Sequence, residues 1–161
     1  MKNEMRSKNL SRKMPSKRVD IVAIKMVKEG SILYTKRKIT SPSDAVSIGN
    51  EFLHNADREK LLVCSLDTRN QPLTINIASE GSLNSAIVHP REIFKAAILS
   101  NAASIILFHN HPSGDVSPSN EDINITRRIK EAGKIIGIEL LDHIIIGFNS
   151  NFCSLKEKGF L

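Results

Sequence analysis

Two histidines at the end of an apolar run restrict the fold of this chain more than any other feature of its sequence. Residues 104–108 are mostly apolar and rich in β-branched side chains, a pattern that predicts a buried strand. His109 and His111 follow, and a two-residue step along an extended chain puts both side chains on the same face. We therefore expect both imidazoles to reach one point at the end of this strand.

A turn and a helix start bring a carboxylate toward the same point. Residues 112–114 are Pro-Ser-Gly and predict a turn, and Pro118 stands near the first position of a predicted helix. Ser119 and Asp122 are three residues apart and share one face of its first turn. Two imidazoles and one carboxylate suit Zn²⁺, and three protein ligands leave a fourth position open for water, as in catalytic zinc sites.

Each of these features also has a purely structural interpretation. Ser119-x-x-Asp122 resembles a capping box with Asp in place of Glu or Gln. His109 alone would fit a hydrogen-bonded histidine at a strand end. The combination around one short turn favours the metal site. No pair of cysteines lies near the histidines, which argues against a closed structural zinc site.

These residues carry a resemblance to a known family. His109-x-His111 followed by Ser119-x-x-Asp122 resembles the JAMM motif of the JAB/MPN metalloproteases, and the string HNHPSGD resembles its RadC branch. The resemblance runs from about Ser41 to the C-terminus and includes VHPRE at 88–92, NAA at 101–103 and LDHIIIG at 141–147. It implies a JAB/MPN-like fold with a cytidine-deaminase-like layout. It also implies a zinc metallopeptidase or isopeptidase, with His109, His111 and Asp122 as the metal ligands.

The resemblance implies further roles outside the ligand set. JAMM enzymes use an upstream glutamate for proton transfer, and Glu59, just before an apolar strand, matches the segment where the RadC branch carries it; Glu80 is the alternative. Ser119 would donate a hydrogen bond to the oxyanion, which its capping role allows because a hydroxyl both donates and accepts. Asp142 is a candidate acceptor for a hydrogen bond from a ligand histidine.

Three other polar residues near these motifs have less specific interpretations. Asp115 is interpreted as a turn former rather than a ligand. His89 and His143 lie outside the ligand set, and each is either a structural residue or a neighbour of the site.

The remaining pattern predicts an α/β fold with a mixed, largely antiparallel central sheet and flanking helices. Predicted helices cover 41–55, 90–100 and 119–132, the last with Gly133 as its C-cap, and predicted strands cover 61–66, 73–78, 104–108 and 137–146. We expect residues 41–161 to form this RadC-like JAB/MPN domain. Residues 19–40 predict an N-terminal β-hairpin, with strands at 19–27 and 31–34.

The positive charge of the chain is concentrated at its N-terminus. Residues 1–40 contain twelve Lys or Arg and three Asp or Glu, a net charge of +9, whereas the rest contains eleven and fourteen, a net charge of −3. Residues 1–18 predict a basic, disordered tail. Such a tail either binds nucleic acid or another acidic partner, or only keeps the chain soluble, and it has no aromatic residue to stack on bases.

Two patterns bear on the compartment. No segment approaches 18 consecutive apolar residues, and the basic N-terminus lacks the apolar core of a secretory signal, so we expect no membrane association. Cys64 and Cys153 are too few and too far apart for a disulfide scaffold, which favours the reducing cytoplasm.

Three functions are compatible with the sequence. The first is the zinc enzyme, in which a zinc-bound water attacks the amide carbonyl of a peptide or an amide-linked protein conjugate and Glu59 moves the proton. The second is a DNA-repair-associated RadC-like protein that binds nucleic acid through residues 1–40. Those residues predict a tail and a hairpin, however, and not the helix-hairpin-helix segment of many longer RadC-like chains. The third is a non-catalytic MPN scaffold. The sequence does not predict an oligomeric state.

Overall fold

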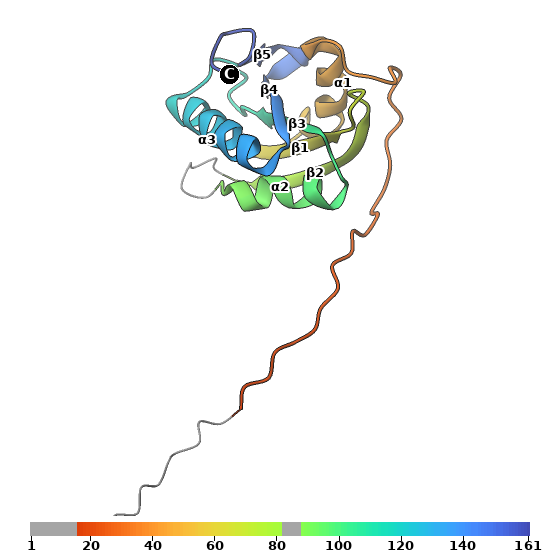
Figure 1. Ribbon diagram of the computed structural model, residues 1–161. Coiled ribbons are helices and arrows are strands. Elements are labelled where there is room, and N and C mark those ends of the chain that lie inside the picture. The colour runs from red at the N-terminus through yellow and green to blue at the C-terminus, as the bar shows by residue number, and fades with distance from the viewer. Residues whose placement is uncertain (1–15, 82–87) are drawn as a thin grey trace, which may run out of the picture.

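The computed structural model describes residues 16–81 and 88–161, and it shows a central sheet with helices on both faces (Figure 1). The elements are α1 (Pro42–Leu53), β1 (Lys60–Leu66), β2 (Pro72–Glu80), α2 (Pro90–Leu99), β3 (Ser104–Asn110), α3 (Asn120–Ile136), β4 (Glu139–Ile146), the 3₁₀ turn η1 (Phe148–Ser150) and β5 (Phe152–Ser154). The strand order is β2-β1-β3-β4-β5; β3 and β4 pair in parallel, and the other neighbours pair antiparallel. The predicted α/β fold with a largely antiparallel mixed sheet is confirmed.

The central strand β3 is covered on both faces, and this burial sets up the end of the strand. Alternate side chains point to opposite faces: Leu107 packs in the cluster that contains α2 and α3, and Phe108 packs in the cluster that contains α1. Gly49 lets α1 approach closely, since a Cβ there would lie 2.8 Å from the Phe108 ring. The same alternation carries two polar residues, His109 and Asn110, into the buried end of the strand.

Helix α3 begins and ends at residues whose local chemistry explains its bounds. Its N-cap Ser119 forms a capping box with Asp122, as the sequence predicts. Gly133 was predicted as the C-cap, but it lies within the helix, where a Cβ would be 2.5 Å from the carbonyl oxygen of Ile138. The C-cap is Gly137, whose φ of +81° is the left-handed conformation that glycine adopts without strain. Gly133 therefore serves close packing rather than helix termination.

The predicted hairpin over residues 19–40 is not formed. Residues 16–40 are extended but contain no strand, and they leave the domain beside β2 and then project away from it (Figure 1). A two-stranded hairpin is marginally stable unless one face packs against something, and most of the apolar side chains of this segment are exposed. Most of the predicted basic tail at 1–18 lies outside the described residues. Within the described residues, no helix is long and apolar enough to span a membrane.

Candidate metal centre

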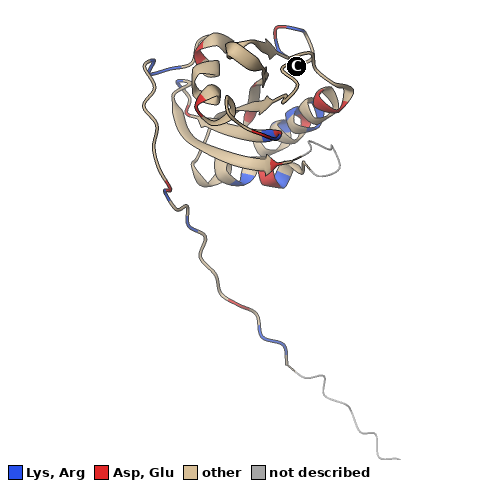
Figure 2. Cartoon of the chain, turned by 180° about the vertical axis from the view of Figure 1, so that it is seen from behind, with Lys and Arg blue, Asp and Glu red and all other residues tan. Residues whose placement is uncertain are grey.

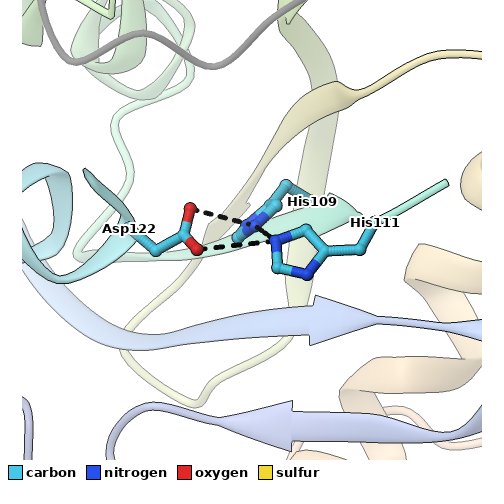
Figure 3. A group of neighbouring side chains, drawn as sticks. All are labelled: His109, His111 and Asp122. Carbon is cyan, nitrogen blue, oxygen red and sulfur yellow. Dashed lines mark hydrogen bonds and ion pairs between the residues drawn. The ribbon is translucent and has the colours of Figure 1, made fainter. Parts of the chain in front are cut away.

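The end of β3 and the first turn of α3 bring three potential ligands together. His109 is the second-last residue of β3, His111 follows the strand, and Asp122 lies in the first turn of α3. His109 Nε2 lies 2.9 Å from His111 Nε2 and 3.2 Å from Asp122 Oδ1, and His111 Nε2 lies 3.5 Å from Asp122 Oδ2. The two rings and the carboxylate point toward one another (Figure 3). The predicted ligand set is thus assembled from the predicted elements.

The spacing of these atoms fits a small tetrahedral cation. A zinc ion with ligands at about 2.0–2.1 Å holds neighbouring ligand atoms about 3.3 Å apart, within the range of the three distances here. His109 and Asp122 are 0% and 3% exposed, whereas His111 is partly exposed, so access to the centre is from the His111 side. This His-His-Asp group can hold a metal ion.

A buried chain of hydrogen bonds determines which nitrogen of His109 faces the centre. The Thr126 hydroxyl donates to the carbonyl oxygen of Asp122 at 2.6 Å, so its oxygen must accept from His143 Nδ1, also at 2.6 Å. The other nitrogen of His143 is then an acceptor, and it accepts from His109 Nδ1 at 2.8 Å. His109 therefore presents the lone pair of Nε2 to the centre, as a metal ligand requires.

His111 is oriented in the same sense by the turn that follows it. Its Nδ1 lies 2.5 Å from the carbonyl oxygen of Asp115, and because a carbonyl only accepts, Nδ1 carries a proton. A neutral His111 thus also directs a lone pair of Nε2 toward Asp122. The hydrogen bond with Asp122, opposed by partial burial, raises the pKa of His111 above its usual value. Three converging acceptors attract a proton or a metal cation to the same position.

The capping box of α3 holds the carboxylate of the centre. Burial acts to raise the pKa of Asp122, but the contacts of its carboxylate with the His109 and His111 rings outweigh burial, and the pKa lies well below its usual range. Asp122 is therefore ionised, as a metal ligand must be. The Ser119 backbone N–H and hydroxyl each donate to Asp122 Oδ2 at 2.7 Å. Ser119 thus lies beside the centre, and its proposed role as oxyanion donor stays a prediction.

Asn110 fixes the backbone on both sides of Glu59, the predicted base. The Asn110 amide donates to the carbonyl oxygen of Arg58 at 3.0 Å, and its oxygen accepts from the N–H of Lys60 at 2.8 Å. The chain is thus held on both sides of Glu59 by a residue that stands between the two histidines. Glu59 is half-buried, and its charge acts to raise the pKa of His111. The pairing of Leu61 with His109 places Glu59 at the same end of β3 as the two histidines.

Two other residues predicted from the sequence, Asp142 and Glu80, have partners different from those expected. Asp142 does not accept from a ligand histidine: its carboxylate accepts from Ser154 Oγ at 2.6 Å and from the N–H groups of His143 and Lys156 at 2.7 and 3.1 Å. It joins β4 to the chain around β5, and His143 contacts His109 instead. The alternative base, Glu80, forms ion pairs with Lys60 and Arg58 at 3.3 and 3.9 Å.

Three further residues were singled out from the sequence: His89, Asp115 and His143. His89 is the N-cap of α2, and its buried Nδ1 has no hydrogen-bond partner within the described residues. Asp115 accepts from the N–H of Ser117 at 2.9 Å and shapes the turn after His111. The sequence left the role of His143 open. It is 1% exposed, and burial lowers its pKa well below the usual value.

Sequence reasoning did not identify Thr126 and Asn110 as site residues. Thr126 is one turn after Asp122 on α3, a spacing that places both on one helix face and was available in the sequence. Asn110 lies between two predicted ligands, but alternation along a strand directs it to the opposite face. Only the pairing of β1 with β3, which sets Leu61 opposite His109, shows what Asn110 reaches.

Comparison with known proteins agrees with the geometry. A profile of the RadC-like JAB domain matches residues 39–160. The chain is 57% identical over 124 residues to a UPF0758 protein of Clostridium beijerinckii, which covers 77% of this chain and 54% of that protein. It is 50% identical over 126 residues to a UPF0758 protein of Methanosarcina mazei, which covers 78% of this chain and 55% of that protein. The chain therefore spans about half the length of the curated relatives it matches.

Proposed function

The chain belongs to the RadC-like JAB domain family, and from this premise we propose that it is a zinc-dependent hydrolase that cleaves an amide bond in a peptide or an amide-linked protein conjugate. The observation that carries the proposal is the convergence of His109 Nε2, His111 Nε2 and the Asp122 carboxylate, with the tautomers of the two neutral rings set by hydrogen bonds at Nδ1. A scaffold has no need of such an arrangement, which concentrates acceptor atoms at one point.

The three ligands support a catalytic site rather than a structural one. Three protein ligands leave one coordination position for water or substrate, and the partial exposure of His111 leaves that position open to solvent. A bound Zn²⁺ would lower the pKa of a water molecule toward neutrality and polarise the substrate carbonyl.

The protein side chains supply the proton transfers and orientation. Glu59, whose neighbours Arg58 and Lys60 are held by the Asn110 amide, would take a proton from the attacking water and deliver it to the leaving amine. Ser119 Oγ, at the N-terminus of α3, would turn its hydrogen bond from Asp122 to the developing oxyanion. The N-terminus of this helix adds a favourable dipole for negative charge.

Elemental analysis of the purified protein tests the metal part of the proposal. We expect about one zinc per chain, lost in His109→Ala and in Asp122→Ala and retained in the matched control His54→Ala, because His54 is exposed and outside the group. Amide hydrolysis is then assayed with a peptide library and a lysine-linked protein conjugate, before and after chelation. A wild-type protein that takes up no zinc when supplied with it would overturn the enzyme proposal and favour a scaffold.

A further inference from the structure

The segment from Val19 to Val27, here named the arm, exposes more apolar surface than its own domain can cover. Its five large branched side chains, Val19, Ile21, Val22, Ile24 and Val27, are 74–102% exposed. They point to both sides of an extended chain, as in a strand that is buried on both faces. Figure 2 shows the segment that contains the arm projecting beyond the domain, which agrees with the exposure of these side chains.

The strand β2 presents the complementary feature. It lies at the edge of the sheet, so within the described residues its outward N–H and C=O groups have no strand partner. Leu73 and Ile77 on this strand are 44% and 46% exposed. An unpaired edge with apolar side chains is a template for another strand. In the part of the chain that the structure describes, one molecule therefore has both an extended segment, the arm, that pairs with no sheet and a sheet edge, β2, that pairs with no further strand.

An open groove lies between β2 and the chain at the C-terminal end of the arm. It is lined by residues 26–32 on one side, by β2 on the other, and by α2 residues such as Ala96 and Leu99. Ile32 packs against the α1 cluster, so the wall opposite β2 is anchored to the domain. The groove runs along the unpaired edge, where an added strand would lie.

The path by which the chain leaves the domain favours pairing of the β2 edge with the arm of a second molecule. The Ile39 N–H donates to the Asn70 carbonyl at 2.9 Å, and Thr40 donates to Asp44, which also pairs with Lys36. These contacts fix where the chain leaves the domain, and from there it runs beside β2 and then away from the domain (Figure 1). We propose that the arm of one copy pairs with the β2 edge of a second copy in a two-fold symmetric, arm-exchanged dimer.

Symmetry makes the exchange complete. In a two-fold dimer each copy gives one arm and receives one, so both unpaired edges and both apolar arms are covered in a closed assembly. The inference rests on the arm and the sheet edge alone, and it holds whether or not the metal centre is catalytic.

Sedimentation equilibrium of the full chain across a concentration series tests the proposal. We expect a dimer for the wild type, and monomers for Ile24→Asp in the arm and for Ile77→Lys on the edge. Ile135→Asp is the matched control, since Ile135 is 89% exposed on α3, and it should remain a dimer. Circular dichroism verifies that each variant is folded; both altered side chains are at least 46% exposed, so folding should persist.

Hydrogen exchange of the arm amides separates the alternatives. Protection of residues 19–27 in the wild-type dimer, lost in Ile77→Lys, supports pairing with β2 of the second copy. A monomer with a protected arm would mean that the arm folds back on its own edge, and a dimer that persists in both variants would place the interface elsewhere. A monomer with an unprotected arm would indicate that the arm binds a different protein. Each of these three results overturns the proposal.

Discussion

His143 Nε2 lies 2.8 Å from His109 Nδ1, so a β4 residue outside the predicted ligand set determines which nitrogen His109 presents to His111 and Asp122. Both rings are almost completely buried, and Thr126 holds the far side of His143. Without this chain His109 would have no fixed tautomer, because either ring nitrogen could carry its proton. The orientation of His109 thus depends on the packing of α3 on the sheet.

Replacing Thr126 by valine should weaken zinc binding without changing a ligand. Valine keeps the shape but has no hydroxyl, so His143 Nδ1 loses its acceptor. Changes at such supporting residues reduce metal affinity by about 10- to 100-fold, and the unpaired buried N–H lowers the free energy of unfolding by about 1–3 kcal/mol. Zinc titration against a competing chelator and thermal unfolding of the metal-free protein measure these effects.

The matched control for this change is Thr126→Ser, which retains the hydroxyl and should retain most of the zinc affinity. A valine variant with wild-type affinity would show that His143 does not orient His109.

Replacing Glu59 by glutamine should separate catalysis from metal binding. The amide cannot take a proton from water, so the rate of amide hydrolysis should fall by about 10²- to 10⁴-fold while zinc content stays unchanged. The control is Glu80→Gln, which removes a half-exposed carboxylate that is paired with Lys60 and lies on the returning strand. If Glu80→Gln loses turnover and Glu59→Gln keeps it, the base is Glu80.

Replacing Asn110 by alanine should release the chain around Glu59. The N–H of Lys60 and the carbonyl of Arg58 both lose their partner, at about 1–3 kcal/mol of unfolding free energy for each group that stays buried. We expect a lower melting temperature and slower turnover with zinc still bound. Asn50→Ala, which removes an amide bonded to Ser150 Oγ near the surface, should change neither. Unchanged turnover in Asn110→Ala would mean that the function of Glu59 does not depend on the hydrogen bonds of Asn110 with Arg58 and Lys60.

The elements and the ligands could be predicted from the sequence because they depend on local spacing. A two-residue step in a strand and a three-residue step in a helix place His109, His111 and Asp122 without knowledge of the rest of the fold. The supporting residues depend on register. Asp142 and His143 are neighbours that face opposite sides of β4, and only the pairing of β4 with β3 decides which one reaches His109.

The predicted hairpin failed for a different reason. Its β-branched residues do predict an extended segment, and residues 16–40 are extended. Composition shows that a segment favours the extended state, but it does not show which strand it pairs with. That choice depends on which sheet edge is open, and the open edge of β2 is known only once the strand order is known.

The metal-free protein should lose stability as the pH rises through the folded pKa of His111. The hydrogen bond with Asp122 raises that pKa above the usual value near 6.5, so protonation of His111 stabilises the folded state. This contribution is complete below about pH 6.5 and is lost above the folded pKa. Buried His143 has a lowered pKa and acts in the opposite direction, since stability falls as its unfolded form is protonated.

The contribution of His111 to stability is distinguished from that of His143 by comparing thermal unfolding of the wild type and His111→Gln. The comparison runs from pH 5.5 to 8.5 with a chelator present. The difference in stability between the wild type and His111→Gln should be largest at the acid end of this range and should decrease toward the alkaline end. A pH-independent difference would contradict the assigned pairing with Asp122. Zinc competes with the proton for the same position, so its affinity should instead increase with pH.

Replacing Gly147 by alanine should displace the turn that carries His111. Gly147 follows β4, and a Cβ there would lie 2.5 Å from the carbonyl oxygen of Gly114 and 2.7 Å from the Val116 side chain. The first obstacle is backbone, so the turn must move, and such overpacking costs about 1–3 kcal/mol of unfolding free energy. His111 is also bound to this strand end, since its N–H donates to the Ile146 carbonyl at 3.1 Å. We therefore expect a lower melting temperature together with weaker zinc binding.

Gly30→Ala is the control for Gly147→Ala, because a Cβ at Gly30 meets no atom within 4 Å and its backbone is not in the left-handed region. It should change neither the melting temperature nor zinc affinity. If Gly147→Ala lowers the melting temperature but binds zinc as the wild type does, the position of His111 is set by Asp115 and the capped helix rather than by contact with the end of β4. Weaker zinc binding in Gly147→Ala with an unchanged melting temperature would instead show that the turn yields easily and that the geometry of the centre is sensitive to small displacements of His111.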